Sequence, residues 1–351
     1  MRNFARIITL QLALIIPLMM YADDQSIINA ANKVLQTEPV AVTDKTFSVS
    51  GNPHNFESLS IYWWPNPQNP AGPYIAKDGQ ANPEHKQYDL PRLLKMVDNL
   101  QKVGKAYIIT KDSRYYDFFC KQLDVWFINE ETKMLPNFNY CQFIPGRNNG
   151  KGNPQGMIDS YNFNSIIENV NKVNAIQPIG NKRMKSLKKW MKSFANWMEN
   201  SDNGKVASQY KNNQGIAYDT TLFNIYRFAE NNKKCSQLIL SCCNRIKQQI
   251  DNEGKQPEEI KRTRAYFYSI WNLQHIVEFL TYANDASFKI DNETKRKVCK
   301  SIQYLEQFIG HKEKFPYKDI STDWGENERL LSNIRTQAYN LEVCSPIDSQ
   351  E

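Results

Sequence analysis

The sequence predicts an all-α fold in which paired helices form a helical solenoid or a closed toroid. Apolar residues recur every three or four positions in segments of about fifteen residues, the spacing that places them on one face of a helix. Most connections between these segments are short, which favours antiparallel helix pairs, and strand signals are few. No repeat of fixed length is visible, which argues against a simple open repeat array.

Ten segments carry the helical pattern, and Asp112-Ser113 gives the third of them a plausible N-terminal start. The predicted helices are Gln25–Gln36, Pro91–Ile108, Tyr115–Ile128, Phe163–Ile176, Lys182–Glu199, Ile216–Glu230, Ser236–Ile250, Ile270–Tyr282, Thr294–Ile309 and Glu326–Leu341. Three irregular stretches, 43–89, 134–161 and 201–215, are rich in Asn, Pro and Gly. We expect them to collect at the concave end of the toroid and to line it.

The N-terminus has the features of a secretory signal. Arg2 and Arg6 precede an apolar run from Ile7 to Met20, and two acids follow at Asp23 and Asp24. The run is too short for a confident membrane helix, so we expect no stable membrane insertion after cleavage. The sequence thus predicts a signal peptide at 1–22, a single domain at 23–351, and a periplasmic or secreted protein. Cleavage removes two arginines and no acids, which lowers the formal net charge from +7 to +5.

Composition narrows the function classes. With 41% hydrophobic and 23% charged residues, the chain of 351 residues is long enough to bury a large core. A small positive charge without a binding motif or a dense basic run makes nucleic acid an improbable partner. Seven cysteines without a CxxC motif and four scattered histidines argue against a metal site, and no cofactor is expected. Most of the cysteines fit buried thiols in helices, with room for one disulfide.

The stretch Lys211–Asp219 interrupts two helical segments with adjacent carboxamides at Asn212, Asn213 and Gln214. Each carboxamide offers two N–H donors, so several aimed at one point can hold a carboxylate. The alternative is a loop with an Asn-rich helix cap, which is the better interpretation of an Asn-Asn pair alone. A second polar cluster about fifty residues later, Glu259–Ser269, favours the functional interpretation.

Two irregular stretches carry aromatic and amide side chains. Tyr62, Trp63 and Trp64 stand beside a proline turn, where they can either plug one end of the helical array or face a sugar ring. A second loop supplies amides, a phenol and a guanidinium at Asn139, Tyr140, Gln142 and Arg147. Such a loop is often a network of turns, but its lack of apolar periodicity favours a ligand-facing role.

Several motifs in this order resemble the alginate lyase family of (α/α) toroid polysaccharide lyases. The motifs are Tyr62-Trp-Trp-Pro-Asn-Pro, Pro73-Tyr-Ile, Tyr88-Asp-Leu-Pro-Arg, Leu135-Pro-Asn-Phe-Asn-Tyr-Cys-Gln142, Asn212-Asn-Gln-Gly, Arg262-Thr-Arg, Tyr268-Ser and Asn272-Leu. The resemblance runs from about Asn55 to Tyr317. It implies an incomplete barrel of helical hairpins with long loops lining a cleft, and β-elimination of an anionic uronic-acid polysaccharide.

The resemblance also implies roles for individual residues. Asn213 and Gln214 match the pair that contacts the sugar carboxylate, and Tyr268 matches the catalytic tyrosine. Arg262 matches an arginine that would favour the phenolate of Tyr268, and Arg264 is a weaker candidate for the same task. The predicted substrate-binding residues are Tyr62, Trp63, Trp64, Asn139, Tyr140, Gln142, Arg147, Asn212, Tyr218 and Arg264.

The sequence departs from the family pattern at Gln214, where the family has histidine. Glutamine donates hydrogen bonds but does not titrate near neutral pH. Either Tyr268 acts alone as base and acid, which suits mannuronate or glucuronate units better than guluronate, or the chain is a weakened, glycan-binding relative. We favour the first because the other matching residues are intact.

An inverting glycoside hydrolase is a third hypothesis, since helical toroids host such enzymes. It would need two carboxylates about 6.5–9.5 Å apart. Asp159, Asp219 and Glu259 are available, but no pair of acids lies in an assignable motif, and we expect Asp219 to support its loop.

Overall fold

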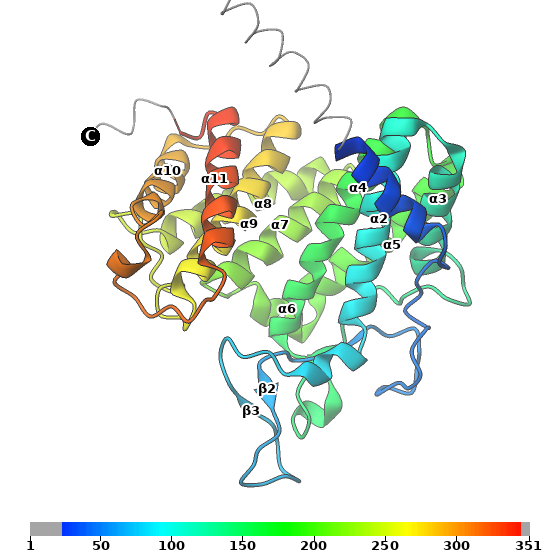
Figure 1. Ribbon diagram of the computed structural model, residues 1–351, viewed down its shortest axis with the longest axis horizontal. Helices are drawn as coiled ribbons and strands as arrows, with labels where there is room; N and C mark the ends of the chain where they lie inside the picture. The colour runs from blue at the N-terminus through cyan, green and yellow to red at the C-terminus, as the bar shows by residue number, and fades with distance from the viewer. Residues whose placement is uncertain (1–22, 345–351) are drawn as a thin grey trace, which may run out of the picture.

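A computed structural model of the protein describes residues 23–344, and its helices lie in two layers (Figure 1). A first helix covers residues 23–34. The helices that follow are α2 (Leu90–Thr110), α3 (Ser113–Phe127), α4 (Asn162–Ile176), α5 (Asn181–Asn200), α6 (Asp202–Ala207), α7 (Asn213–Phe228), α8 (Asn232–Gln249), α9 (Ala265–Asp285), α10 (Asn292–Glu306) and α11 (Trp324–Asn340). The predicted signal peptide at 1–22 lies outside the described residues.

Neighbouring helices form an incomplete toroid. Helices α2, α4, α7, α9 and α11 pack in that order as one row, and α3, α5, α8 and α10 pack behind them as the second partners of hairpins. The two ends of the row, α2 and α11, lie on opposite sides of the molecule in Figure 1. The arrangement confirms the predicted (α/α) architecture. Helices α7 and α9 are buried on nearly all sides, as expected for the middle of such an array.

Helix starts follow local capping chemistry. The Asp112 carboxylate accepts a hydrogen bond from the Arg114 N–H at the start of α3, and Asp291 accepts one from Thr294 at the start of α10. The largest differences from the predicted starts are at α7, at α9, and at α8, which begins at Asn232 instead of Ser236. Helix α7 begins at Asn213 instead of Ile216, because Asn212 caps it by accepting from the Gln214 N–H at 3.2 Å. Helix α9 begins at Ala265, five residues before the predicted start.

Short strands join the irregular stretches to one another. Strand β1 (Glu57–Leu59) runs parallel to β4 (Tyr140–Phe143), and β2 (Trp63–Trp64) pairs antiparallel with β3 (Ile75–Ala76). The β2–β3 hairpin projects from the lower side of the helices in Figure 1. A 3-10 helix at Pro154–Tyr161 packs on both α6 and α7. These contacts bring the stretches 43–89, 134–161 and 201–215 to one end of α7, as the sequence predicts.

An aromatic cluster and a disulfide each join neighbouring parts of the array. Phe163, Trp190 and Phe194 pack between α4 and α5, with the last two rings stacked 5.5 Å apart. Cys299 in α10 forms a disulfide with Cys344 after α11. The remaining cysteines among the described residues, Cys120, Cys141, Cys235, Cys242 and Cys243, are buried thiols. Within residues 23–344, no helix has the length and apolarity needed to cross a bilayer.

Candidate functional site

A cavity of about 400 Å³ lies where the three irregular stretches meet the starts of α7 and α9. It gathers side chains that are far apart in sequence, such as Tyr62 and Tyr268, which are 206 positions apart. Its lining residues are Ser60, Ile61, Tyr62, Trp63, Ala76, Asp78, Gln142, Gln155, Ile158, Tyr210, Asn212, Asn213, Gln214, Arg262, Tyr268 and Trp271. All four predicted catalytic residues and four of the predicted binding residues are therefore neighbours in space.

Tyr268 lies in the first turn of α9, with only 3% of its surface exposed. Its hydroxyl donates a hydrogen bond to the Tyr62 hydroxyl at 3.0 Å, which joins α9 to the β2 strand region. The Arg262 guanidinium lies over the Tyr268 ring, 3.8 Å from the ring centroid. A phenol, a second phenol and a cation thus stand in contact at one side of the cavity.

Burial raises the pKa of Tyr268 well above its usual value, and Tyr62 raises it further. Arg262 acts in the opposite direction and lowers this pKa, as the sequence predicts, but its contribution is smaller than that of burial. One reason for the small contribution is that the guanidinium contacts both the Tyr268 ring and the Asp78 carboxylate. Arg262 also forms an ion pair with Asp78 at 2.6 Å, so part of its charge is already compensated.

Asp78 ties the loop after β3 to the segment before α9. Besides its ion pair with Arg262, its carboxylate accepts hydrogen bonds from the Thr263 hydroxyl at 3.0 Å and the Thr263 N–H at 3.3 Å. Burial raises the pKa of Asp78, but the bonds to Arg262 and Thr263 outweigh burial and lower it overall. The carboxylate therefore stays ionised and fixes the guanidinium above the phenol.

The amides at the start of α7 have distinct partners. Asn213 is 1% exposed, and it donates to Glu259 through both its backbone N–H, at 2.6 Å, and its side-chain Nδ2, at 2.7 Å. Asn212 uses its side-chain oxygen to cap the helix, so the capping interpretation of this residue is the one that its contacts support. Gln214 is half-buried and lines the cavity.

A buried amide network lies beneath these residues. Gln249 donates to the Asn212 carbonyl at 2.9 Å, and Asn272 donates to both Gln249, at 3.1 Å, and Gln256, at 2.8 Å. Gln256 in turn donates to the Ser269 carbonyl in the first turn of α9. The network connects the start of α7 to the start of α9 and fixes the distance between the amides and Tyr268.

The loop before α7 is held by a second buried group. Arg245 pairs with Asp219 at 2.7 Å and donates to the Tyr210 and Ser208 carbonyls. Asp219 therefore supports the loop, as expected. Gly215 is required here because a Cβ at this position would clash with the Tyr210 carbonyl.

The predicted acids do not form a hydrolytic pair. Asp159 accepts hydrogen bonds from Gln142 at 2.8 Å and Ser58 at 3.0 Å, Asp219 is paired with Arg245, and Glu259 is bonded to Asn213. None of these three acids is among the lining residues of the cavity. Within residues 23–344, no cluster of His, Cys, Asp and Glu has an arrangement that would hold a metal ion.

Three predicted binding residues lie beside the cavity without lining it. Arg147 is exposed and stacks over Trp63, with its guanidinium 4.6 Å from the ring. Asn139 and Tyr140 line a second cavity of about 530 Å³. Asn139 accepts a hydrogen bond from the indole of Trp197 at 3.0 Å, and Lys151 also lines this second cavity.

Three other predicted binding residues have structural partners. The Trp64 indole donates to the Gln80 carbonyl at 2.9 Å. Tyr218 is buried within α7 and donates to the Met198 carbonyl at 3.1 Å. Arg264 forms an ion pair with Asp323 at 2.9 Å and donates to the Ser321 hydroxyl at 3.0 Å. The structure does not bring these three residues into the Tyr268 cavity.

Several cavity residues were not predicted. Trp271 follows Tyr268 by three positions on α9, and this helical spacing is a signal that the sequence does contain. Tyr210 precedes the amide stretch and lines the cavity, whereas Asp78 approaches from a distant loop. His275, deeper on α9, is fully buried, and burial lowers its pKa to about 3, so it stays neutral.

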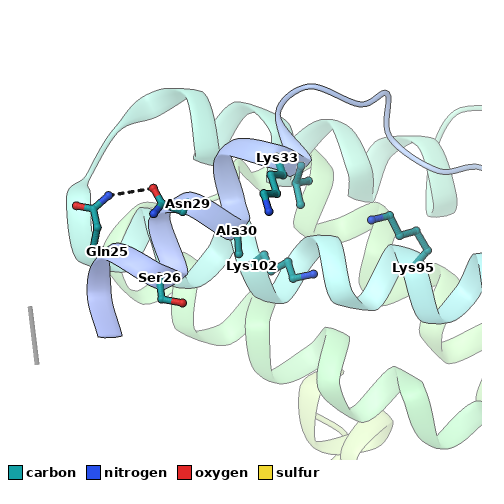
Figure 2. Close-up of a pocket in the computed structure, with 8 residues that line it drawn as sticks. Gln25, Ser26, Asn29, Ala30, Lys33, Lys95 and Lys102 are labelled. Carbon is teal, nitrogen blue, oxygen red and sulfur yellow. Dashed lines mark hydrogen bonds between the residues drawn. The ribbon is translucent and has the colours of Figure 1, made fainter. Parts of the chain in front are cut away.

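A larger hollow of about 810 Å³, which shares no lining residue with this site, lies between the helix at 23–34 and α2 (Figure 2). Figure 2 shows Lys33, Lys95 and Lys102 around it, together with a hydrogen bond from Gln25 to Asn29 at 3.0 Å. Lys102 is paired with Asp98. Lysines in open solvent bind anions weakly, and none of the predicted site residues lies here.

Comparisons with known proteins agree with the geometry. The sequence model of the family described as alginate lyase matches residues 40–315. The crystal structure of an alginate lyase from Bacteroides ovatus superimposes with a TM-score of 0.85 at 31% identity, over 91% of this chain and 86% of that chain. Alginate lyase A1-III from Sphingomonas species A1 has a TM-score of 0.50 at 12% identity, over 82% and 77% of the two chains, and shows the fold alone. No curated protein matches this chain significantly.

Proposed function

The chain belongs to the alginate lyase family and is a polysaccharide lyase, and we propose that it cleaves a polymer of mannuronate or glucuronate by β-elimination in the Tyr268 cavity. The observation that carries the proposal is the convergence of Tyr268, Arg262, Asn213 and Gln214 on that cavity. An acidic polymer is the substrate class that the family implies, and the cavity offers amide and guanidinium donors for its carboxylates.

The first task of the site is to stabilise charge on the sugar carboxylate. The proton on the neighbouring ring carbon is very weakly acidic while that carboxylate carries a full negative charge. We assign the carboxylate to the amides of Asn213 and Gln214, whose N–H groups would strengthen their bonds as the enolate-like dianion develops. Preorganised donors in a sheltered site contribute about 3–4 kcal/mol each to such a transition state.

The second task is proton transfer, which we assign to Tyr268. Its phenolate takes the proton from the ring carbon beside the carboxylate, the C–H electrons form the new ring double bond, and the bond to the glycosidic oxygen breaks. The leaving oxygen then receives the proton from Tyr268, which returns the side chain to its starting state. Because the pKa of Tyr268 is raised, the reactive phenolate is a minor form at neutral pH. The Arg262 guanidinium over the ring lowers this pKa and so increases the phenolate fraction.

The identity of Gln214 selects the substrate within this scheme. Glutamine cannot accept a proton near neutral pH, so base and acid functions both fall to Tyr268 on one face of the sugar. This geometry suits mannuronate and glucuronate, whereas guluronate has the opposite configuration at the proton-bearing carbon and needs a base on the other face. We therefore propose that polyguluronate is a poor substrate and that Gln214→His increases its cleavage.

The residues beside the cavity extend the proposed binding surface. We assign Asn139, Tyr140 and Arg147 to sugars farther along the polymer, because they lie on the loop that also places Gln142 in the cavity. The Trp63 ring, with Arg147 stacked on it, provides a flat apolar face for a sugar ring.

Ultraviolet absorbance of the new ring double bond tests the proposal. The purified protein is incubated with polymannuronate, glucuronan and polyguluronate, and reducing ends are measured in parallel. We expect absorbance with one of the first two polymers and loss of turnover, with binding retained, in Tyr268→Phe. Reducing ends without absorbance would indicate a hydrolase, binding without either product would indicate a glycan-binding relative, and wild-type turnover in Tyr268→Phe would overturn the assignment of the base.

We also propose that residues 1–22 direct export to the periplasm or the medium, on the basis of the charged start and apolar run of this segment. Expression of the complete chain in a bacterial host, followed by fractionation and N-terminal sequencing, checks this. The expected exported product begins at Asp23, and a cytoplasmic product beginning at Met1 would contradict the proposal.

A further inference from the structure

We infer that Glu259 is a positioning residue, which holds the Asn213 carboxamide in the one orientation that leaves an N–H for the sugar carboxylate. The inference rests on the proposed function and adds a residue that does not line the cavity and does not touch substrate. It starts from two hydrogen bonds that Asn213, in the first turn of α7, donates to the Glu259 carboxylate in the segment before α9. One comes from the Asn213 backbone N–H and the other from its side chain.

The contact has the geometry of a clamp. One oxygen of Glu259 accepts from the Asn213 backbone N–H at 2.6 Å, and the other accepts from Nδ2 at 2.7 Å. Both residues are 1% exposed, so water does not compete for these bonds. The backbone N–H belongs to the start of α7, where the helix dipole favours a negative charge. Two bonds to one carboxylate fix both the main chain and the side chain of Asn213.

The clamp determines which way the carboxamide faces. A carboxamide has one oxygen and one NH₂ group of similar size, and without a partner it can turn by half a rotation. An ionised carboxylate only accepts hydrogen bonds, so it favours the NH₂ group and repels the amide oxygen. With one N–H given to Glu259, the second N–H of Nδ2 is available to a substrate carboxylate in the cavity that Asn213 lines.

The protonation state of Glu259 therefore affects the orientation of the Asn213 carboxamide. Burial raises the pKa of Glu259 to about 7, although the bonds from Asn213 and the charge of Arg262 lower it, and Glu258 raises it slightly. A protonated carboxyl donates a hydrogen bond and no longer imposes one orientation on the amide. On α9, Tyr268 lines the same cavity as Asn213, and His275 is buried and stays neutral because burial lowers its pKa to about 3.

If Glu259 had only a structural role, its replacement would have different effects on stability and turnover. If Glu259 only supported the start of α7, its removal would lower stability and leave turnover per folded molecule unchanged. Its effect would also add to that of Asn213→Ala. A positioning role acts through Asn213, so the two changes would not add.

A double-mutant cycle separates these roles. Glu259→Gln keeps the shape but brings an NH₂ group to the clamp, and we expect it to lower kcat about ten- to hundredfold with KM nearly unchanged. Asn213→Ala lowers kcat at least as much, and the double variant is expected to be no slower than Asn213→Ala alone. Glu259→Asp, which keeps the charge, should restore part of the rate. Additive losses, or an unchanged kcat in folded Glu259→Gln, would overturn the inference.

Asp291→Asn is the matched control. Asp291 caps α10 through the Thr294 N–H at 2.9 Å, so it is a carboxylate at a helix start that lies outside the cavity. Its replacement should lower stability with no change in kcat. This control shows whether loss of a helix-start carboxylate is by itself enough to slow the enzyme.

A second readout does not depend on turnover. In protein labelled with ¹⁵N asparagine, the Asn213 side-chain signal is identified by its loss in Asn213→Ala. In the wild type we expect it to shift with a midpoint near pH 7, and in Glu259→Gln we expect a different position without that midpoint. Identical signals in both proteins at every pH would overturn the inference. The expected signals from a protein without lyase activity would contradict the proposed function and leave the clamp intact.

Discussion

Two amide-rich stretches look alike in sequence and differ in the contacts that hold their side chains. The stretch 212–214 lies at the start of α7. There the Asn213 side chain donates to Glu259, and the Asn212 carbonyl accepts from Gln249. The stretch 137–142 lies on a loop, and its Asn139 is exposed and bonded to Trp197 at the edge of another cavity. A carboxamide can donate to a substrate carboxylate in a fixed geometry when buried partners fix its orientation and leave one N–H free. An amide on an exposed loop has no such constraint.

The comparison is tested most strongly by removing one amide from each stretch. Asn213→Ala should lower kcat about 10²- to 10³-fold, because it removes a fixed donor to the developing negative charge. Asn139→Ala should change kcat by less than about threefold, since its carboxamide is not positioned at the reacting group. Initial rates of absorbance increase on polymannuronate or glucuronan measure both. Equal losses in the two variants would show that the difference between the stretches has no bearing on the chemistry.

The pH dependence tests the same site through its phenol. The base form of Tyr268 is the phenolate, and its pKa is raised, so kcat/KM should rise about tenfold per pH unit from neutral pH upward. Tyr62 raises this pKa, so Tyr62→Phe should move the rise to lower pH. Asn139→Ala should leave the profile unchanged. A flat profile between neutral and alkaline pH in the wild type would contradict a tyrosine base.

The free energy of unfolding should depend on the protonation state of Glu259, whose carboxyl group is bonded to Asn213. The pKa of Glu259 is about 7 in the folded protein against 4.5 without burial, so this carboxyl binds its proton more tightly in the folded state. The free energy of unfolding should therefore fall as pH rises from 4.5 to about 7, by on the order of 3 kcal/mol from this group. Denaturant unfolding of the wild type and Glu259→Gln over this range should show a steeper fall in the wild type. Parallel curves would contradict the assignment.

The smallest effect is expected at the loop cavity. Lys151→Ala should raise KM for a long polymer about two- to fivefold at low salt and less at high salt, because exposed charges contribute under about 1 kcal/mol. Turnover of saturating substrate should not change. Lys95→Ala, in the hollow of Figure 2, is the matched control and should leave KM unaltered. A similar rise in both variants would indicate general charge attraction instead of a polymer path over Asn139 and Tyr140.

The fold was predictable because its information is local. Apolar spacing identifies the helices of the array, and errors concentrate at their starts, such as Asn213 and Ala265, where capping decides the boundary. The motifs likewise place Tyr268, Arg262, Asn213 and Gln214 in one cavity. The motifs do not show which of their residues face the cavity. Tyr218 follows Asn213 by five residues, and this spacing turns it to a different face of α7.

The partners that shape the site were not predictable from local pattern. Asp78 meets Arg262 from 184 positions away, and Tyr62 meets Tyr268 from 206 positions away. Nothing in the sequence around either residue specifies these contacts, because they depend on how the β2–β3 region folds against α9. The role of Glu259 also depends on packing, since its burial against the start of α7 is what makes it a clamp instead of a surface acid.

The fate of solvent oxygen tests the central claim most directly. The wild-type protein is allowed to cleave its polymer in water enriched in heavy oxygen, and the new chain ends are examined by mass spectrometry. Elimination predicts unsaturated ends that are lighter by one water and carry no heavy oxygen, and it predicts their disappearance in Tyr268→Phe. New non-reducing ends that are saturated, so that the two products together gain the mass of one water, would show hydrolysis and would contradict the account.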